Sequence, residues 1–296
     1  FKKWADYARA PIQGWAPHYY CGTTGHALEF TTDQWYEMLH KANAMEKLIR
    51  DQWGALAVAD PQHKIKLVID EWGAWHPKGT EIDPRHLFEQ MGCLRDALVA
   101  ALTLDTFNRH ADKIDMANVA QLVNNLHSLF LADEDKFVAT PNFHVFEMYA
   151  AHQGGQAVRT LFSAPALSFK RAAPNPPPQA TAQMSPQQRA RMQAEAQATP
   201  TLWGLQGSAS LNGNTLTLTV VNPHATEARE TEIAVRGAKV LSGQATTLTA
   251  KDIHAHNNFE DPRALTPSNS PVQAQSGATV HRFPAASVTR LQFSLA

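Results

Sequence analysis

The 296-residue chain has few cysteines, no long apolar run and almost no net charge. Its two cysteines, Cys21 and Cys93, lie far apart and match no metal-binding spacing, so they fit two free thiols or one disulfide and indicate no redox compartment. The sequence has no run of 18 apolar residues, so we expect no membrane span. A net charge of −1 gives no electrostatic reason to expect nucleic acid or an anionic membrane as a partner.

Metal and targeting signals are also missing. The 14 histidines include no pair at a convincing ligand spacing on one helix face, and we interpret His254 and His256 as structural, so neither metal nor cofactor is expected. The chain starts with Phe1 and shows no signal-peptide pattern, so its compartment, cytoplasmic or secreted, is not indicated. What remains is an ordinary globular composition, 44% hydrophobic and 18% charged, long enough for one large domain or two smaller ones.

Residues 1–160 alternate short apolar runs with longer stretches of helical periodicity. The sequence predicts helices in four segments: 1–9, 33–53, about 85–110, and one that begins at Thr140-Pro141. Residues 65–70 are typical of a buried strand, whereas 114–124 fit a strand or a helix equally well. This alternation predicts an α/β domain over 1–160 with a parallel sheet and crossover helices.

Residues 161–296 follow a different pattern, dominated by short alternating segments. Residues 214–222 alternate almost strictly and follow a turn at Asn212-Gly213, and similar short strands recur to the end of the chain. This pattern predicts an all-β sandwich or jelly-roll domain. A Pro-, Ala- and Gln-rich stretch at about 171–200 cannot bury a core, so we predict a flexible insertion there, with a partner-binding segment as the alternative.

Two carboxylates and several aromatic residues gather where the predicted strand ends. The stretch KIKLVIDEWGAWHP (64–77) places Asp70 and Glu71 there, and WAPHYY (15–20) adds an imidazole and two phenols after another short strand. Functional residues of a parallel sheet collect past the carboxyl ends of its strands. Each group alone also fits a solvated turn, a salt bridge or a partly buried aromatic cluster. Together they predict a sugar site, because aromatic rings suit the C–H faces of a sugar and polar groups suit its hydroxyls.

Several motifs, in this order, resemble the carboxyl-terminal half of the glycoside hydrolase family 51 α-L-arabinofuranosidases. They are HYY, VIDEWGAWHP, MANVAQLVN, TPNFHVFEMYAAHQG and DIHAHNNFEDP. The resemblance covers nearly the whole chain except 171–200. It implies a (β/α)8 TIM-barrel portion, lacking its first half, followed by a jelly roll.

The resemblance also implies roles for individual residues. Glu71 matches the catalytic nucleophile, His18 and Tyr20 match residues at the end of the preceding barrel strand, Trp75 matches a wall of the substrate pocket, and Gln121 matches a residue that contacts arabinose. The implied reaction is retaining hydrolysis of terminal α-L-arabinofuranosyl residues from arabinan, arabinoxylan or arabino-oligosaccharides. A retaining enzyme needs a second carboxylic acid roughly 5–5.5 Å from the nucleophile.

The chain departs from the family pattern at that second acid. The family's Gly-Asn-Glu acid/base motif does not occur, and we expect neither Glu29 nor Glu81 to replace it. Asp70 should point away from Glu71, since neighbours in a strand face opposite sides. Gly73 stands where many relatives have Asn, and we expect little consequence.

Three readings of the function therefore stay open. In the first, the protein is an arabinofuranosidase, completed by a chain that supplies the missing barrel half. In the second, it is a related retaining hydrolase that acts on β-glucan or xylan. In the third, it is a non-catalytic carbohydrate-binding or assembly fragment. The sequence neither supports nor opposes a homo-oligomer.

Overall fold

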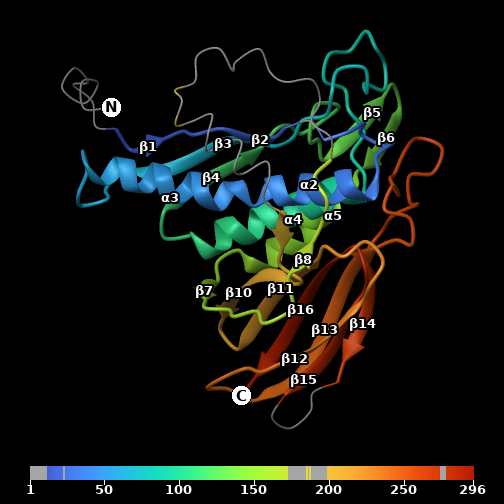
Figure 1. The fold of residues 1–296 in the computed structure, drawn as a ribbon. Coiled ribbons are helices and arrows are strands. Elements are labelled where there is room, and N and C mark those ends of the chain that lie inside the picture. Colours follow the sequence, from blue (N-terminus) through green and yellow to red (C-terminus); the bar gives the residue numbers. More distant parts are fainter. Residues whose placement is uncertain (1–11, 23, 173–184, 186, 188–198, 274–277) are drawn as a thin grey trace.

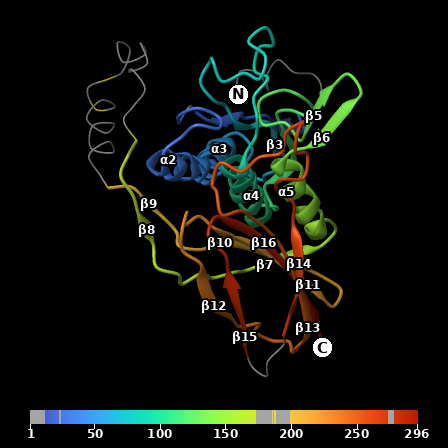
Figure 2. The same cartoon turned by 90° about the vertical axis from the view of Figure 1, so that its right-hand side faces the viewer.

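A computed structural model describes residues 12–22, 24–172, 185, 187, 199–273 and 278–296. The predicted helix at 1–9 and most of the predicted insertion at 171–200 lie outside these residues. The described chain forms three layers: a parallel sheet, a layer of helices below it, and a β-sandwich beneath the helices (Figure 1). The view turned by 90° shows the same order of layers (Figure 2).

The first layer confirms the predicted parallel sheet. Strand β3 (Lys66–Ala74) lies at its centre, with β4 (Ile114–Val119) on one side and both β1 (Gly14–Trp15) and β2 (Tyr19–Cys21) on the other. All these pairings are parallel. The strand predicted at 65–70 is therefore correct in kind but continues four residues further, so Asp70 and Glu71 lie within it. The ambiguous segment 114–124 begins as a strand.

Helices α2 (Thr32–Ala42), α3 (Ala44–Ala57) and α4 (Leu94–Arg109) cover one face of this sheet. The Thr31 hydroxyl caps α2 by accepting from the Gln34 amide, as the predicted N-cap requires. The single helix predicted at 33–53 is wrong in one respect. It is divided at Asn43, whose N–H donates to the His40 carbonyl in a tighter i to i−3 turn.

Helix α4 is buried on almost every side, because it packs on the sheet and also on the sandwich. Its predicted start near residue 85 is wrong. The Asp83 carboxylate accepts hydrogen bonds from Arg85 in a local turn, and the helix begins only after Cys93. There the Asp96 carboxylate accepts from the Cys93 N–H, which closes a capping box.

A hairpin and a short helix complete the α/β part. Strands β5 (Phe130–Asp133) and β6 (Lys136–Ala139) form the hairpin, and α5 (Pro141–Tyr149) begins where the Thr140-Pro141 pair predicted it. A 3-10 turn, η1 (Ala150–His152), follows.

The sandwich confirms the predicted antiparallel all-β part. Its larger sheet has the order β14-β13-β16-β11-β10-β7, faced by the pair β12 and β15, and a small pair β8 and β9 lies beside it. These strands are β7 (Gln156–Val158), β8 (Leu167–Ser168), β9 (Thr201–Leu202), β10 (Gln206–Asn212), β11 (Thr215–Asn222), β12 (Arg229–Ile233), β13 (Val240–Thr249), β14 (Ser268–Val272), β15 (Thr279–Phe283) and β16 (Ser287–Leu295). Gly213 takes the positive φ of 55° that the predicted turn requires. A domain division near residue 160 stays a prediction.

Both cysteines are free and buried, which settles the question of a bridge between them. In the part of the chain that the structure describes, no helix is both long and apolar enough to cross a membrane.

Candidate active site

Strand β3 carries a bulge at residues 70–71. Ile69 lies opposite Ala117 of β4, and Trp72 lies opposite Val119, so three steps along β3 face two steps along β4. One extra residue is therefore inserted into β3 between these pairs. The insertion shifts the strand's alternation by one position, as the burial of its side chains confirms: Leu67 and Ile69 are buried, and so are Trp72 and Ala74.

The bulge places both carboxylates on the face of the sheet that points away from the helices. The prediction that Asp70 points away from Glu71 is wrong, because strict alternation does not hold across a bulge. The His18 ring lies between the two acids, with Nε2 2.9 Å from Asp70 Oδ1 and Nδ1 3.2 Å from Glu71 Oε2. All three side chains are about half exposed. The site therefore contains two carboxylates joined by one imidazole.

Tyr20 supplies a third contact to the same carboxylate. Its hydroxyl donates to Glu71 Oε2 at 3.2 Å, because the parallel register of β2 and β3 places Tyr20 opposite Gly73. Burial, together with the negative charge of Glu71, raises the pKa of Tyr20 to about 12. The phenol therefore keeps its proton near neutral pH and donates a hydrogen bond to Glu71.

Trp75 forms an aromatic wall beside this group. Its ring lies edge-on to Tyr20, 5.1 Å between centroids, and also edge-on to Phe88, at 4.8 Å. Trp72, the other tryptophan of the motif, is buried in the core between Phe107 and Phe146 and takes no part in the wall.

Gln121 lies just past the end of β4, in line with its predicted place. The N–H of the preceding Ala120 donates to the Trp72 carbonyl, which holds this segment beside β3. The Gln121 side chain is exposed and has no hydrogen bond within the described residues. The structure thus brings His18, Tyr20, Glu71 and Trp75 into direct contact and places Gln121 at the neighbouring strand end.

The backbone conformation of Gly73 and its closest neighbour both favour glycine at this position. Its φ of +151° is one that side chains rarely adopt, and a Cβ there would lie 2.5 Å from the Cβ of His127. The expectation that glycine in place of Asn has little consequence for the chemistry stays a prediction, but the backbone at this position favours glycine. An Asn at 73 would require the buried His127 to move.

Sequence reasoning missed a buried polar cluster directly behind the site, formed by His76, Asp96, Arg95 and His127. Its one visible signal was the spacing of Cys93 and Asp96, which is the spacing of a capping box. Of the other acids considered, Glu81 accepts from the Gly79 N–H in its own turn. Within the described ranges, no group of three or more His, Cys, Asp or Glu side chains could hold a metal ion.

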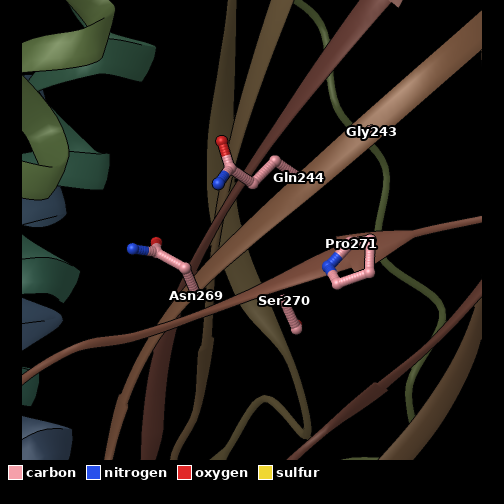
Figure 3. A pocket seen from close by; sticks show the side chains of 5 residues that line it. All are labelled: Gly243, Gln244, Asn269, Ser270 and Pro271. Carbon is pink, nitrogen blue, oxygen red and sulfur yellow. The ribbon is translucent and has the colours of Figure 1, made fainter.

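Two shallow hollows lie elsewhere on the molecule. One lies between β13 and β14, where the amides of Gln244 and Asn269 and the ring of Pro271 line a groove that has no aromatic wall (Figure 3). The other lies between the loop after β2 and the sandwich, beside Glu29, Phe30 and His254. Neither combines a carboxylate, a donor to it and an aromatic face as the strand-end group does.

The chain is similar to known α-L-arabinofuranosidases. Residues 70–287 match the model of the α-L-arabinofuranosidase C-terminal domain. An intracellular exo-α-L-arabinofuranosidase of Bacteroides ovatus is 28% identical, over 98% of this chain and 53% of that protein. The crystal structure of the GH51 arabinofuranosidase of Xanthomonas axonopodis pv. citri superposes with a TM-score of 0.80 at 26% identity, over 95% of this chain and 53% of that one.

An arabinofuranosidase of Thermotoga maritima, crystallised with arabinose, has a TM-score of 0.73 at 20% identity and supports the fold alone. The chain spans about half the length of these relatives. The family match extends from the carboxylates of β3 into the last strand of the sandwich. The chain therefore belongs to the α-L-arabinofuranosidase C-terminal domain family and corresponds to the carboxyl-terminal half of a family 51 enzyme.

Proposed function

We propose that the protein hydrolyses terminal α-L-arabinofuranosyl residues with retention of configuration, and that Glu71 is the nucleophile. The observation that carries this proposal is the environment of Glu71 Oε2, which lies within 3.2 Å of both the Tyr20 hydroxyl and the His18 ring. The hydrogen bond from the Tyr20 hydroxyl fixes the orientation of the carboxylate that attacks. The half-exposed position leaves the carboxylate accessible to a sugar.

The other site residues take roles that follow from their contacts. Trp75 offers an apolar face to the sugar ring, and Tyr20 links that wall to the nucleophile. Asp70 orients the His18 ring from its far nitrogen, so that the other nitrogen faces Glu71. Gln121, exposed at the neighbouring strand end, is placed to hydrogen-bond a sugar hydroxyl.

The acid/base carboxylic acid is supplied by a polypeptide segment that is not part of this carboxyl-terminal half. Three features support this: the absence of a Gly-Asn-Glu motif, the coverage of about half of each relative, and a face of the parallel sheet that no described helix or sheet covers (Figure 1). On that face Met116 is exposed and Val68 partly so, and in the described part of the chain β2 and β4 pair with β3 alone. Further strands at these edges would complete a barrel, cover the apolar side chains and bring an acid to the site.

The reaction proceeds by double displacement. The Glu71 carboxylate attacks the anomeric carbon as the acid protonates the departing glycosidic oxygen, which leaves with the bonding electron pair. The same acid, now a base, then takes a proton from water, whose oxygen displaces Glu71 from the anomeric carbon.

The test is hydrolysis of 4-nitrophenyl α-L-arabinofuranoside by the protein with its full native chain. Glu71→Ala should lower kcat on the order of a thousandfold or more, because it removes the attacking group. Added azide should then restore nitrophenolate release and yield the β-configured arabinosyl azide, since azide attacks the face that Glu71 left free.

Asp70→Ala is the matched control, because it removes the neighbouring carboxylate and should lower kcat far less. Equal activity of the wild type and Glu71→Ala would remove Glu71 from the mechanism. Binding of arabinose without any turnover by the wild type would instead indicate a carbohydrate-binding protein.

A further inference from the structure

We infer that Asp96 is a positioning residue for the candidate active site. Acting through the His76 ring, it holds the segment that carries Trp75 against Tyr20. Asp96 lies in the first turn of α4, fully buried, and touches neither Glu71 nor the open face of the sheet. Its influence on the site therefore passes through other side chains, by way of hydrogen bonds and close contacts between them.

The first step joins Asp96 to His76. Asp96 Oδ1 lies 2.9 Å from His76 Nε2, and both side chains are about 2% exposed. The Arg95 guanidinium, a donor only, lies 3.4 Å from His76 Nδ1. Nδ1 therefore accepts and Nε2–H donates, which defines the orientation of the imidazole ring between the two charged groups.

The second step joins His76 to the aromatic wall. The Gln90 side chain accepts from the His76 N–H and donates to the His76 carbonyl, both at 3.0 Å, so the backbone of His76 is held as firmly as its ring. Trp75 is the preceding residue, and its own N–H donates to the Cys21 carbonyl at the end of β2. With both sides of Trp75 anchored, its ring is held beside Tyr20.

The third step joins the same helix end to the loop after β2. The Arg95 guanidinium donates to the carbonyls of Thr24 and His26, each at 2.9 Å, and lies 3.7 Å above the Phe30 ring. Asp96 Oδ2 meanwhile accepts from Cys93 N–H at 2.9 Å. The first turn of α4 thus holds both loops that flank Tyr20 and Trp75.

A sandwich loop reinforces this helix end. The Leu94 N–H donates to the Ala255 carbonyl, and Cys93 pairs with His256 as an antiparallel bridge. His254 contacts the same β2 loop, with Nε2 2.8 Å from the Phe30 carbonyl. The sandwich therefore reaches the site through the residues that Asp96 organises.

The test compares Asp96→Asn with Asp105→Asn, a matched change of a second buried carboxylate on the same helix that contacts the sandwich instead. The protein is labelled with 5-fluorotryptophan, and the Trp75 resonance is assigned with Trp75→Phe. We expect the 19F resonance of Trp75 to shift or broaden in Asp96→Asn and to stay unchanged in Asp105→Asn. A Trp75 resonance that is unmoved in a folded Asp96→Asn, or moved equally in both variants, would overturn the inference.

His76 provides a second pair of variants in case Asp96→Asn fails to fold. His76→Leu removes the contact to Asp96, whereas His76→Gln retains an N–H donor near the Nε2 position. The inference requires the Trp75 resonance to move in His76→Leu and to return toward its wild-type position in His76→Gln. Equal displacement in both would contradict it.

The consequence for catalysis rests on the proposed function. With 4-nitrophenyl α-L-arabinofuranoside, KM should rise about tenfold in Asp96→Asn while kcat changes less, because a displaced wall weakens sugar binding before it affects the nucleophile. A wild type without activity would refute the proposed function, and the 19F comparison would still decide the role of Asp96.

Discussion

Helix α4 carries two buried carboxylates whose surroundings are opposite in kind. Asp96, in its first turn, lies against the His76 ring and within the influence of the positive charge of Arg95, at the end of the helix where backbone N–H groups point outward. Asp105, further along the same helix, faces the sandwich and accepts hydrogen bonds from three neutral hydroxyls. These come from Tyr149 at 2.8 Å, Ser208 at 2.7 Å and Thr219 at 2.6 Å.

Comparing Asp96 with Asp105 shows how a neighbouring charge and hydrogen bonds each affect the pKa of a buried carboxyl group. Burial disfavours the ionised form of both carboxylates. At Asp96 the hydrogen bond from His76 and the positive charge of Arg95 outweigh burial and hold the pKa well below its usual range. At Asp105 the hydroxyls offset burial only in part, and its pKa rises to about 7. Three hydroxyl donors, even with the charge of Arg109 nearby, therefore do not compensate this carboxylate for full desolvation.

Hydroxyl groups and an imidazole extend the hydrogen-bond network on the Asp105 side of the helix. Since the Thr219 hydroxyl proton is donated to Asp105, His152 Nε2–H donates to Thr219 Oγ1 at 3.1 Å, and Nδ1 accepts from Ser210 Oγ at 2.7 Å. Burial lowers the pKa of His152 to about 4, consistent with a neutral ring. Asp105 thus joins α4 to two strands of the sandwich, whereas Asp96 joins it to the rim of the parallel sheet.

The largest expected effect at a single pH is the loss of stability when each of the two carboxylates is replaced by alanine. Asp96→Ala leaves the buried His76 Nε2–H and the Cys93 N–H without their acceptor, so the free energy of unfolding should fall by about 3 kcal/mol. Asp105→Ala should cost clearly less at pH 8, because it also removes a carboxylate whose ionised form burial destabilises. Urea unfolding at pH 8 measures both, and equal losses would contradict the comparison.

The second prediction concerns the pH dependence of stability. The folded-state pKa of Asp105, about 7, lies above its usual value of 3.8, so the folded protein binds this proton more tightly than the unfolded chain does. Stability from this group is greatest below pH 4 and is lost as the pH rises to 7, by about 4 kcal/mol in all. Asp105→Asn has no carboxyl group that binds or releases this proton. The free energy of unfolding of the wild type, relative to that of the variant, should therefore fall between pH 4 and pH 7.

Asp96 provides the control for that measurement. Its pKa is lowered in the folded state, so its contribution is present above pH 4 and is lost only as the pH falls further. Asp96→Asn should therefore retain the wild-type slope between pH 4 and pH 7. Urea unfolding at pH 5 and pH 8 tests both variants, and a wild-type slope in Asp105→Asn would refute the assignment.

Local patterns in the sequence predicted those elements whose causes are themselves local. The alternation at 214–222 predicted β11, and the Thr140-Pro141 pair predicted the start of α5. Asp83-Pro84 is a good helix start by the same local rules, yet Arg85 binds that carboxylate in a turn and α4 begins after residue 93. A local sequence pattern indicates where a helix can begin, and tertiary packing determines where it does begin.

The bulge in β3 had a signal that was overlooked. Apolar side chains at 67 and 69 continue at 72 rather than 71, which is the change of phase that an inserted residue produces. Recognising it would have placed Asp70 beside His18. The contact between Tyr20 and Glu71, 51 residues apart, depended on strand order, which the family resemblance supplied. The roles of Asp96 and Asp105 depend on which faces of α4 are covered, and no local pattern encodes that.

The smallest expected effect tests whether the hydroxyls around Asp105 respond to its charge. Tyr149→Phe removes the hydroxyl that donates to Asp105 Oδ2 and keeps the ring, at a cost of about 1–2 kcal/mol at pH 8, where Asp105 is ionised. The cost should shrink at pH 5, where the carboxyl is protonated and a weaker acceptor. Tyr36→Phe is the matched control, because the Tyr36 hydroxyl accepts from the uncharged Ala225 N–H and its removal should cost the same at both pH values. If the Tyr149→Phe loss were also independent of pH, Asp105 would not titrate in this range and its contrast with Asp96 would disappear.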